Sequence, residues 1–281
     1  MKPYVYALGA VLCWASLPAA TGSGLEGLAV PELLFFSFVP AAVYLSAQEM
    51  VLSRRLSIPW PDLKLAGLGL CGIFGYHAVY YLALDHAPLV EGAILTTTWS
   101  FWIVVFSSVL AARRLSWPVL AVALAGLFGA GLVVSGGRDL HFDPRFLPGY
   151  LLALSCGLIW SGFSVALSRL KPQRDYMPAF TVLAALASTL VFATSAPDHL
   201  PDPKALLSAV YLGLVPLGLS FTLWNRAVTT GSMVLIGYLS YLTPPLAVLL
   251  AAVVRGSAVT AHAVAGMTII LGAAFFGRRM R

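Results

Sequence analysis

A single histidine of this sequence lies deep inside a long apolar stretch, where ionisable side chains are rare. His77 is followed three and four residues later by Tyr80 and Tyr81. If the stretch is an α-helix, this spacing places the three side chains on one face. An imidazole and a phenol both donate and accept hydrogen bonds, and an imidazole can also carry a proton near neutral pH. We interpret the group as the polar wall of a binding cavity; a histidine that is only hydrogen-bonded between helices is the alternative.

Two further apolar stretches, residues 89–112 and 232–253, are interrupted by hydroxyl and aromatic side chains near their centres. The hydroxyl of a Thr or Ser can be satisfied by the preceding turn of its own helix, so one such residue alone indicates little. Pro244 and Pro245 break the second stretch, and backbone freed at membrane depth is tolerated where it is buried or lines a cavity. The central residues that we select as candidate ligand contacts are Thr97, Trp99, Ser100, Tyr238 and Tyr241.

Trp14 and Trp160 also lie near the middle of apolar stretches. Tryptophan usually favours the two membrane interfaces, so an indole at the centre needs close packing or a partner for its N–H group. The pair can form an apolar, polarisable floor beneath a bound side chain, including an aromatic one. A purely structural role in the helix core is the alternative for both residues.

The apolar stretches that carry these residues dominate the composition of the chain. The 281 residues are 59% hydrophobic and only 10% charged, with a mean hydropathy of +0.88. Soluble domains carry about 25% charged residues, and a membrane-spanning helix needs about 20 apolar residues. The composition therefore predicts an all-α polytopic membrane protein, surrounded by a lipid bilayer. We place ten transmembrane helices at 4–22, 33–52, 62–84, 89–112, 117–135, 148–168, 177–195, 205–228, 232–253 and 258–276.

The basic residues predict the orientation of the ten helices. With the N-terminus in the cytoplasm, 13 of the 17 Lys and Arg residues fall on the cytoplasmic side, as the positive-inside rule requires. Both termini are then cytoplasmic, as expected for a multi-pass protein of a bacterial inner membrane. The charges sit in short clusters between apolar stretches, so they form no nucleic-acid-binding surface. A signal peptide at residues 4–22 is the alternative for the first stretch, but we expect this stretch to be retained because it belongs to an internal repeat.

The chain repeats at about half its length. Trp14 and Trp160, 146 residues apart, end two similar segments, Ala-Leu-Gly-Ala-Val-Leu-Cys-Trp and Ala-Leu-Ser-Cys-Gly-Leu-Ile-Trp. The repeat predicts two units, 1–140 and 141–281, with five helices each. Because five is an odd number, the two units must cross the membrane in opposite directions. Inverted repeats of this kind hold a substrate site between them near the midplane, which points to a transporter.

Several short motifs along the chain are similar to those of a known transporter family. They are Leu12-Cys13-Trp14, Thr98-Trp99, Ile159-Trp160, Trp224-Asn225 and Ser240-Tyr241-Leu242-Thr243-Pro244. Because these motifs occur in the same order and with similar spacing, the chain resembles the drug/metabolite transporter superfamily, EamA type. The resemblance implies export of amino acids and related metabolites through a central cavity. The family often has a proline after the tryptophan of its fourth helix, where this chain has Ser100, so we expect a smaller kink there. Trp224 and Asn225 suggest a gate or a helix-end cap.

The acidic residues argue against several other functions. All 11 lie in loops or near helix ends, whereas a proton-coupled cation extruder generally places a carboxylate at the centre of a helix. The sequence has no HExxH, GxSxG or phosphate-loop motif and no CxxC pair, so we expect no enzyme, cofactor or metal site.

Glycines in the fifth and tenth helices predict close packing within one chain, and hence a monomer. We expect facilitative export of aromatic and other neutral amino acids by alternating access. A multidrug or other metabolite exporter is the alternative within the class, and an intramembrane enzyme is the alternative outside it.

Overall fold

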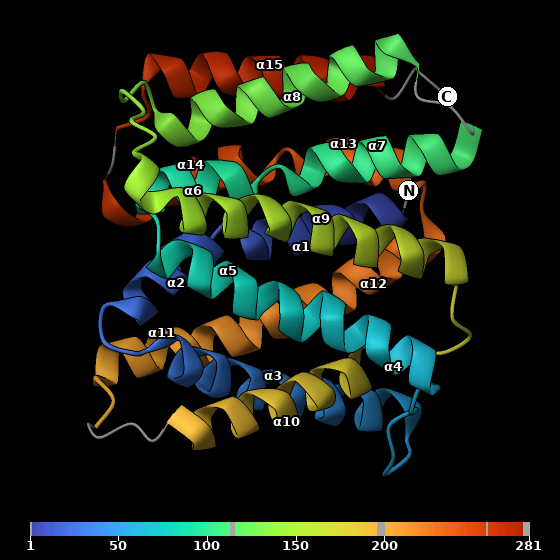
Figure 1. Ribbon diagram of the computed structural model, residues 1–281. Coiled ribbons are helices and arrows are strands. Elements are labelled where there is room, and N and C mark those ends of the chain that lie inside the picture. Colours follow the sequence, from blue (N-terminus) through green and yellow to red (C-terminus); the bar gives the residue numbers. More distant parts are fainter. Residues whose placement is uncertain (1, 113–115, 196–199, 257, 278–281) are drawn as a thin grey trace.

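A computed structural model describes residues 2–112, 116–195, 200–256 and 258–277, and in these ranges the chain folds into helices and loops (Figure 1). Within these ranges, nine helical segments are long and apolar enough to cross a membrane, and Ala261–Gly277 is a shorter apolar helix. The predicted all-α polytopic fold is confirmed, and each of the ten predicted stretches overlaps one of these segments.

The first half of the chain forms α1 (Lys2–Trp14), α2 (Leu17–Leu25), α3 (Val30–Ser53), α4 (Leu63–Gly69), η1 (Leu70–Gly75), α5 (Tyr76–Asp85), α6 (Leu89–Thr96), α7 (Trp99–Ala112) and α8 (Trp117–Ser135). The second half forms η2 (Pro144–Phe146), α9 (Leu147–Leu170), α10 (Met177–Ser195), α11 (Pro203–Leu214), η3 (Val215–Leu219), α12 (Ser220–Thr230), α13 (Met233–Ser240), α14 (Thr243–Arg255) and α15 (Ala261–Gly277). The segments η1 and η3 are π-helical turns, and η2 is a 3₁₀ turn.

Prolines account for three interruptions of the predicted helices. Pro18 lies in the first turn of α2, Pro216 lies in η3, and Pro244 lies in the first turn of α14. A proline has no backbone N–H group, so it cannot donate to the helical hydrogen-bond ladder. The predicted helices 4–22, 205–228 and 232–253 are therefore divided near their centres.

The fourth predicted helix is divided into α6 and α7 without any proline. The hydroxyls of Thr96, Thr97 and Thr98 donate to carbonyl oxygens three residues earlier, at 2.9, 2.6 and 2.8 Å. Such side-chain bonds compete with the backbone N–H groups for the same carbonyls and favour a local break. Ser100, in the position where the family often has proline, thus does not keep this helix continuous.

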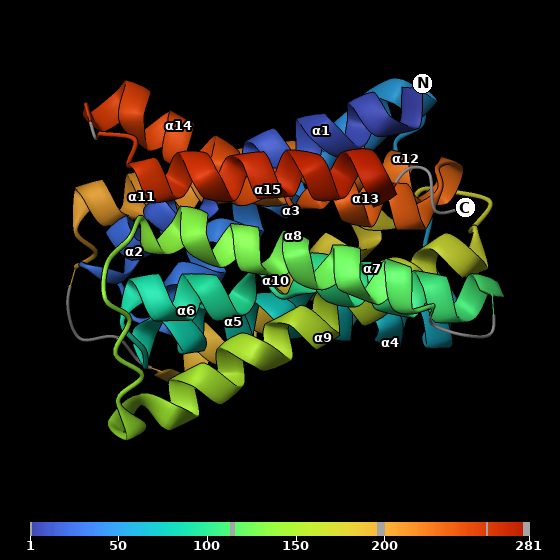
Figure 2. The same cartoon turned by 90° about the horizontal axis from the view of Figure 1, so that it is seen from above.

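Two helix pairs flank a central group of helices (Figures 1 and 2). On one side α8 lies along α15, and on the other side α3 lies along α10. Between these pairs, α1 packs on α12, and α9 packs on both α5 and α7. The interrupted helices are in the central group, where neighbouring helices cover much of the irregular backbone, although Leu70 and Cys71 of η1 are exposed.

The pair α8 and α15 is packed backbone against backbone. A Cβ atom added at Gly129 would lie 2.9 Å from the carbonyl oxygen of Gly266, and one added at Gly266 would lie 2.5 Å from that of Gly129. Glycines at such a contact let two membrane helices approach closely. Gly126, in contrast, faces the ring of Tyr241, and Gly131 and Gly272 have no atom of another residue within 4 Å of a built Cβ.

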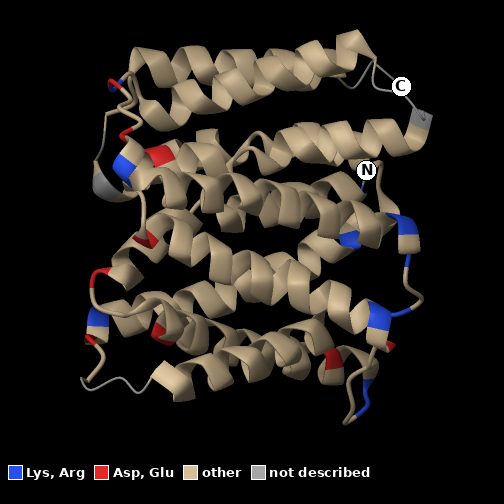
Figure 3. Ribbon diagram, viewed as in Figure 1, with Lys and Arg blue, Asp and Glu red and all other residues tan. Residues whose placement is uncertain are grey.

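Basic residues lie mostly at the end of the bundle that holds the start of α1 and the end of α15, where most of the blue segments of the ribbon are found (Figure 3). The described Lys and Arg residues near that end are Lys2, Arg54, Arg55, Lys64, Arg169, Lys171, Arg174 and Arg226. The arrangement matches the charge asymmetry that the positive-inside rule uses, and the predicted orientation places this end in the cytoplasm.

A reporter fused after Arg281 is therefore expected to read as cytoplasmic, because the basic clusters resist transfer across the membrane. Paired fusions to a fluorescent protein and to a periplasmic phosphatase measure this directly. A second fusion in the loop at Asp139, between α8 and η2, serves as the control and should give the opposite pattern. Phosphatase activity at Arg281 would contradict the orientation.

Candidate substrate-binding cavity

A cavity of about 310 Å³ lies in the central group of helices. Aromatic side chains from the middle of the bundle border one end of it. Leu89, Val90 and Ala251, near helix ends that lie opposite the N-terminus, border the other end. The cavity therefore extends from the middle of the bundle toward the end remote from Lys2. The sequence-selected residues in its lining are Trp14, His77, Tyr80, Thr97, Trp99 and Trp160.

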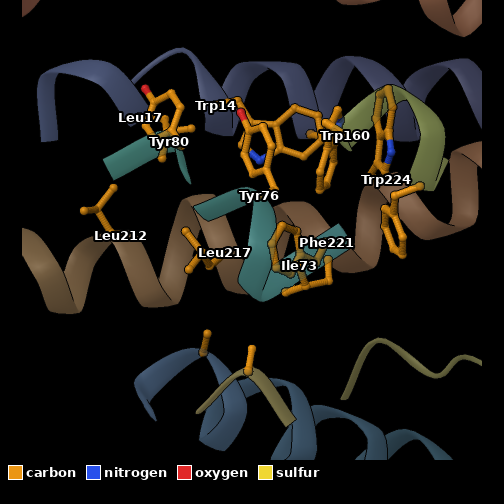
Figure 4. Close-up of a cluster of buried hydrophobic side chains, with 14 of the residues drawn as sticks. Trp14, Leu17, Ile73, Tyr76, Tyr80, Trp160, Leu212, Leu217, Phe221 and Trp224 are labelled. Atoms are coloured by element: carbon orange, nitrogen blue, oxygen red, sulfur yellow. The ribbon is translucent and has the colours of Figure 1, made fainter. Parts of the chain in front are cut away.

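Tryptophans from four helices meet at the inner end of the cavity. The ring centroid of Trp14 lies 5.7 Å from that of Trp99, 5.3 Å from that of Trp160 and 4.9 Å from that of Trp224. The contacts with Trp99 and Trp160 are edge-to-face, the arrangement that the aromatic quadrupole favours. Figure 4 shows Trp14, Trp160 and Trp224 gathered next to Tyr76. We call these four tryptophans the indole floor.

The indole of Trp14 is held by the π-helical turn η3. Its Nε1–H donates to the carbonyl oxygen of Pro216 at 2.9 Å, and the same oxygen accepts from the hydroxyl of Ser220. The side chain is 6% exposed, so the N–H group would be costly to bury without this partner. The interruption of helix 205–228 thus supplies the acceptor that fixes the cavity tryptophan.

A second π-helical turn holds His77 in the same way. The Nδ1–H of His77 donates to the carbonyl oxygen of Ile73, in η1, at 2.8 Å. The rings of Phe38, Tyr76 and Phe221 surround the imidazole, with centroids 5.4, 4.8 and 5.7 Å away. With Nδ1 engaged as the donor, a neutral ring keeps Nε2 as an acceptor. His77 is therefore both part of the cavity lining and bonded to its own helix, which combines the two interpretations drawn from the sequence.

Four sequence-selected residues lie outside the cavity lining. The hydroxyl of Tyr81 is 3.3 Å from the Oγ of Ser37, between α5 and α3. Ser100 accepts a hydrogen bond of 2.8 Å from Ser240. Their direct contact with a substrate stays a prediction, as it does for the remaining two.

Tyr238 and Tyr241 face the α8–α15 pair. The hydroxyl of Tyr241 donates to the carbonyl oxygen of Ala123, in α8, at 2.8 Å. The ring of Tyr238 packs so closely on Gly277, in α15, that an added Cβ there would lie 2.5 Å from it. The residue types correctly indicate polar groups at the centre of this stretch, but they do not tell which neighbours the two tyrosines meet.

Several residues of the site were not selected from the sequence. Tyr76, Phe221 and Thr243 line the cavity, and Trp224 belongs to the indole floor. Trp224 is fully buried, and its Nε1–H donates to the Oγ of Ser164 at 3.0 Å. Tyr76 is one residue before His77 and would have been found by extending the aromatic run, whereas Phe221 has no distinguishing signal in an apolar sequence.

The cavity is closed at the end that carries the chain termini. There α7 crosses α13, and a Cβ added at Gly237 would lie 2.7 Å from Ile103 and 2.9 Å from Val104. The Ser240–Ser100 hydrogen bond joins the same two helices. A membrane-spanning helical bundle with a central cavity that reaches toward one end and is sealed toward the other has the architecture of a small-molecule transporter.

Comparison with known proteins identifies the family. The sequence model of the EamA-like transporter family matches residues 1–135 and, a second time, residues 147–277. The chain belongs to the EamA-like transporter family, and the resemblance drawn from the short motifs is confirmed.

Named relatives cover almost the whole chain. The aromatic amino acid exporter YddG of Ancylobacter novellus is 35% identical over 273 residues, which cover 94% of this chain and 93% of that protein. A probable terminal-alkyne amino-acid exporter of Streptantibioticus cattleyicolor is 27% identical over 96% of this chain and 91% of its own length. A solved crystal structure that is 29% identical superposes with a TM-score of 0.87 and covers 100% of this chain and 99% of that chain.

Proposed function

We propose that this protein exports aromatic and other neutral amino acids across the bacterial inner membrane, by alternating access through the central cavity. The observation that carries the proposal is the indole floor, because three of its tryptophans, Trp14, Trp99 and Trp160, line the cavity and offer an apolar, polarisable surface to an aromatic or aliphatic side chain, while Trp224 packs behind Trp14. Two relatives with names that specify amino-acid export support it. We expect a monomer to carry out the export, because the glycine contacts between α8 and α15 are made within one chain.

The polar groups of the cavity suit a molecule without net charge. Thr97 and Tyr80 contribute hydroxyls, and His77 contributes a neutral ring whose Nε2 can accept a hydrogen bond. An amino-acid ammonium can therefore meet an acceptor and the faces of indole rings, to which cations are attracted. The carboxylate can accept from the hydroxyl of Tyr80, whereas the hydroxyl of Thr97 already donates to Ile94 and offers the substrate only an acceptor. A substrate with a net charge would lose its hydration in this cavity and would find, among the described residues that line it, no side chain of opposite charge to compensate for the loss.

Matched features in the two predicted units support alternating access. The π-helical turns η1 and η3 occupy the third and eighth predicted helices, and the breaks at α6–α7 and α13–α14 occupy the fourth and ninth. In the proposed cycle the units 1–140 and 141–281 rock against each other. The crossing of α7 and α13 then separates, which breaks the Ser240–Ser100 bond and opens the cavity to the cytoplasm.

Replacing His77 by glutamine is expected to lower transport without altering its dependence on a pH gradient. His77 lies in the cavity lining, and no described Asp or Glu forms an ion pair with it, so its ring binds substrate as a neutral group and carries no proton across. Initial rates in proteoliposomes, with and without a protonophore, measure this. The prediction is wrong if the protonophore abolishes uphill export by the native protein and His77→Gln retains only downhill flux.

The proposed function is tested by reconstituting the protein in liposomes with a panel of labelled amino acids. We expect saturable, mutually competitive flux of phenylalanine, tryptophan and leucine down their gradients, and little flux of lysine or glutamate. Liposomes without protein give the background. Flux of a hydrophobic dye cation such as ethidium, without any amino-acid flux, would reject amino-acid export and favour a multidrug exporter.

A further inference from the structure

A second cavity, of about 410 Å³, opens at the end of the bundle that carries the chain termini. It lies between the last turns of α3, the loop at 171–176 and the last turns of α12. Unlike the central cavity, it is lined mainly by polar side chains. We call it the basal pocket, and its polar and charged residues are Glu49, Ser53, Gln173, Arg174, Asp175, Asn225, Arg226 and Thr229.

Charges of both signs line the basal pocket, and within the described residues they form no ion pair with one another. The carboxylates of Glu49 and Asp175 repel each other, and the guanidinium of Arg226 attracts both. Yet in the described part of the chain no N···O contact within 4.0 Å joins Arg226 to either acid. Arg226 instead lies over the ring of Tyr6, 5.9 Å from its centroid. The pocket therefore carries two acidic side chains, Glu49 and Asp175, and two arginines, Arg174 and Arg226, and Arg226 forms no close ion pair with either acid in the described residues.

Asp175 is held in place by the chain around it. Its Oδ1 accepts from the backbone N–H of Met177 at 2.9 Å, and Asn225 donates to the same carboxylate. Burial raises the pKa of this carboxyl, while the two hydrogen bonds and Arg226 act in the opposite direction. A carboxylate that is oriented but poorly hydrated gains when a cation approaches it.

The basal pocket is also connected to the indole floor of the central cavity through α12. Asn225, in its wall, follows Trp224, which belongs to the indole floor. One turn earlier, Thr222 of α12 donates to Gln48 of α3 at 2.6 Å and ties the two walls together. Helix α12 thus contacts both cavities, because its Phe221 lines the central cavity and its Asn225 and Arg226 line the basal pocket.

We propose that the basal pocket is a second substrate site, which binds the charged ends of a zwitterionic amino acid at the cytoplasmic mouth before the molecule reaches the central cavity. Glu49 and Asp175 bind the ammonium group, and Arg226 binds the carboxylate. The inference rests on the proposed function. The basal pocket thus recognises the ammonium and carboxylate groups of the substrate first, and the indole floor then recognises its side chain.

Equilibrium binding of labelled L-phenylalanine to the purified protein tests the second site. We expect two molecules bound per chain. Glu49→Gln and Arg226→Gln should each weaken one of the two sites about tenfold, since each removes a charge-assisted hydrogen bond worth about 1.4 kcal/mol or more. Arg226→Lys should restore part of this binding, because the charge remains. Lys64→Gln, at the same end but outside the basal pocket, is the matched control and should bind two molecules as the native protein does.

A cavity block separates this inference from the proposed function. Ala247 lines the central cavity, so Ala247→Trp should fill it and leave one molecule bound, and that remaining site should be the one that is sensitive to Glu49→Gln. One molecule bound to the native protein, lost in Ala247→Trp and unaffected by Glu49→Gln, would overturn the second site while leaving amino-acid export intact. No amino-acid flux in liposomes would overturn the export function itself.

Discussion

Replacing Trp14 by alanine is expected to reduce amino-acid transport at least tenfold. Trp14 contacts the three other tryptophans of the indole floor and donates to the carbonyl oxygen of Pro216. Its loss removes the centre of the proposed binding surface and leaves a cavity that costs about 3–5 kcal/mol in a packed core. Initial rates of phenylalanine flux in proteoliposomes measure the effect, at equal amounts of monodisperse protein.

Two variants separate binding from folding in this prediction. Trp14→Phe keeps an aromatic ring but has no N–H group for Pro216, so we expect transport between that of the native protein and that of Trp14→Ala. Trp117 begins α8 and is 82% exposed, so Trp117→Ala removes the same side chain where it contacts little and should transport normally. Native transport by a well-folded Trp14→Ala protein would exclude the indole floor as the substrate site.

The helices could be predicted because membrane helices follow a simple physical rule. A span needs about 20 apolar residues, and the charges that separate the spans are confined to their ends. The irregular turns inside the spans were only partly predictable. Pro216 indicates a break in the eighth helix, but η1, with the sequence Leu-Cys-Gly-Ile-Phe-Gly, contains no proline and gives no comparable signal. Such turns are stabilised by the tertiary contacts around them, which a local pattern does not contain.

The cavity could be predicted where a polar or bulky residue is unusual for its depth in the membrane. His77, Trp14 and Trp160 are of this kind, and each lies in the cavity lining. The same reasoning selected Tyr238 and Tyr241, which face α8 and α15 instead. A phenol at membrane depth needs a hydrogen-bond partner or a polar space, and the carbonyl oxygen of Ala123 serves Tyr241 as well as a ligand would. Membrane depth and residue type thus identify which side chains need a hydrogen-bond partner. The packing of the helices decides whether another helix or the cavity provides that partner.

Replacing Gly266 by alanine is expected to destabilise the protein by about 2–3 kcal/mol, a cost typical of overpacked cores. The new Cβ atom would lie 2.5 Å from the carbonyl oxygen of Gly129, and a backbone oxygen cannot rotate away as a side chain can. The helices α8 and α15 would have to separate along their contact. Thermal unfolding in detergent, followed by loss of the monodisperse protein peak, measures the change.

The glycine-to-alanine substitution six residues further along α15, at Gly272, should not lower the stability of the protein. A Cβ atom at Gly272 meets nothing within 4 Å, and alanine is favoured over glycine inside a helix by up to about 1 kcal/mol, so Gly272→Ala should be neutral or stabilising. Gly129→Ala and Gly131→Ala form a second matched pair in α8, with 2.9 Å to the oxygen of Gly266 in the first case and no neighbour in the second. Equal melting temperatures for Gly266→Ala and Gly272→Ala would mean that α8 and α15 do not meet at these glycines. The flanking pair would then provide no rigid support for Tyr241 and for the wall of the cavity beside it.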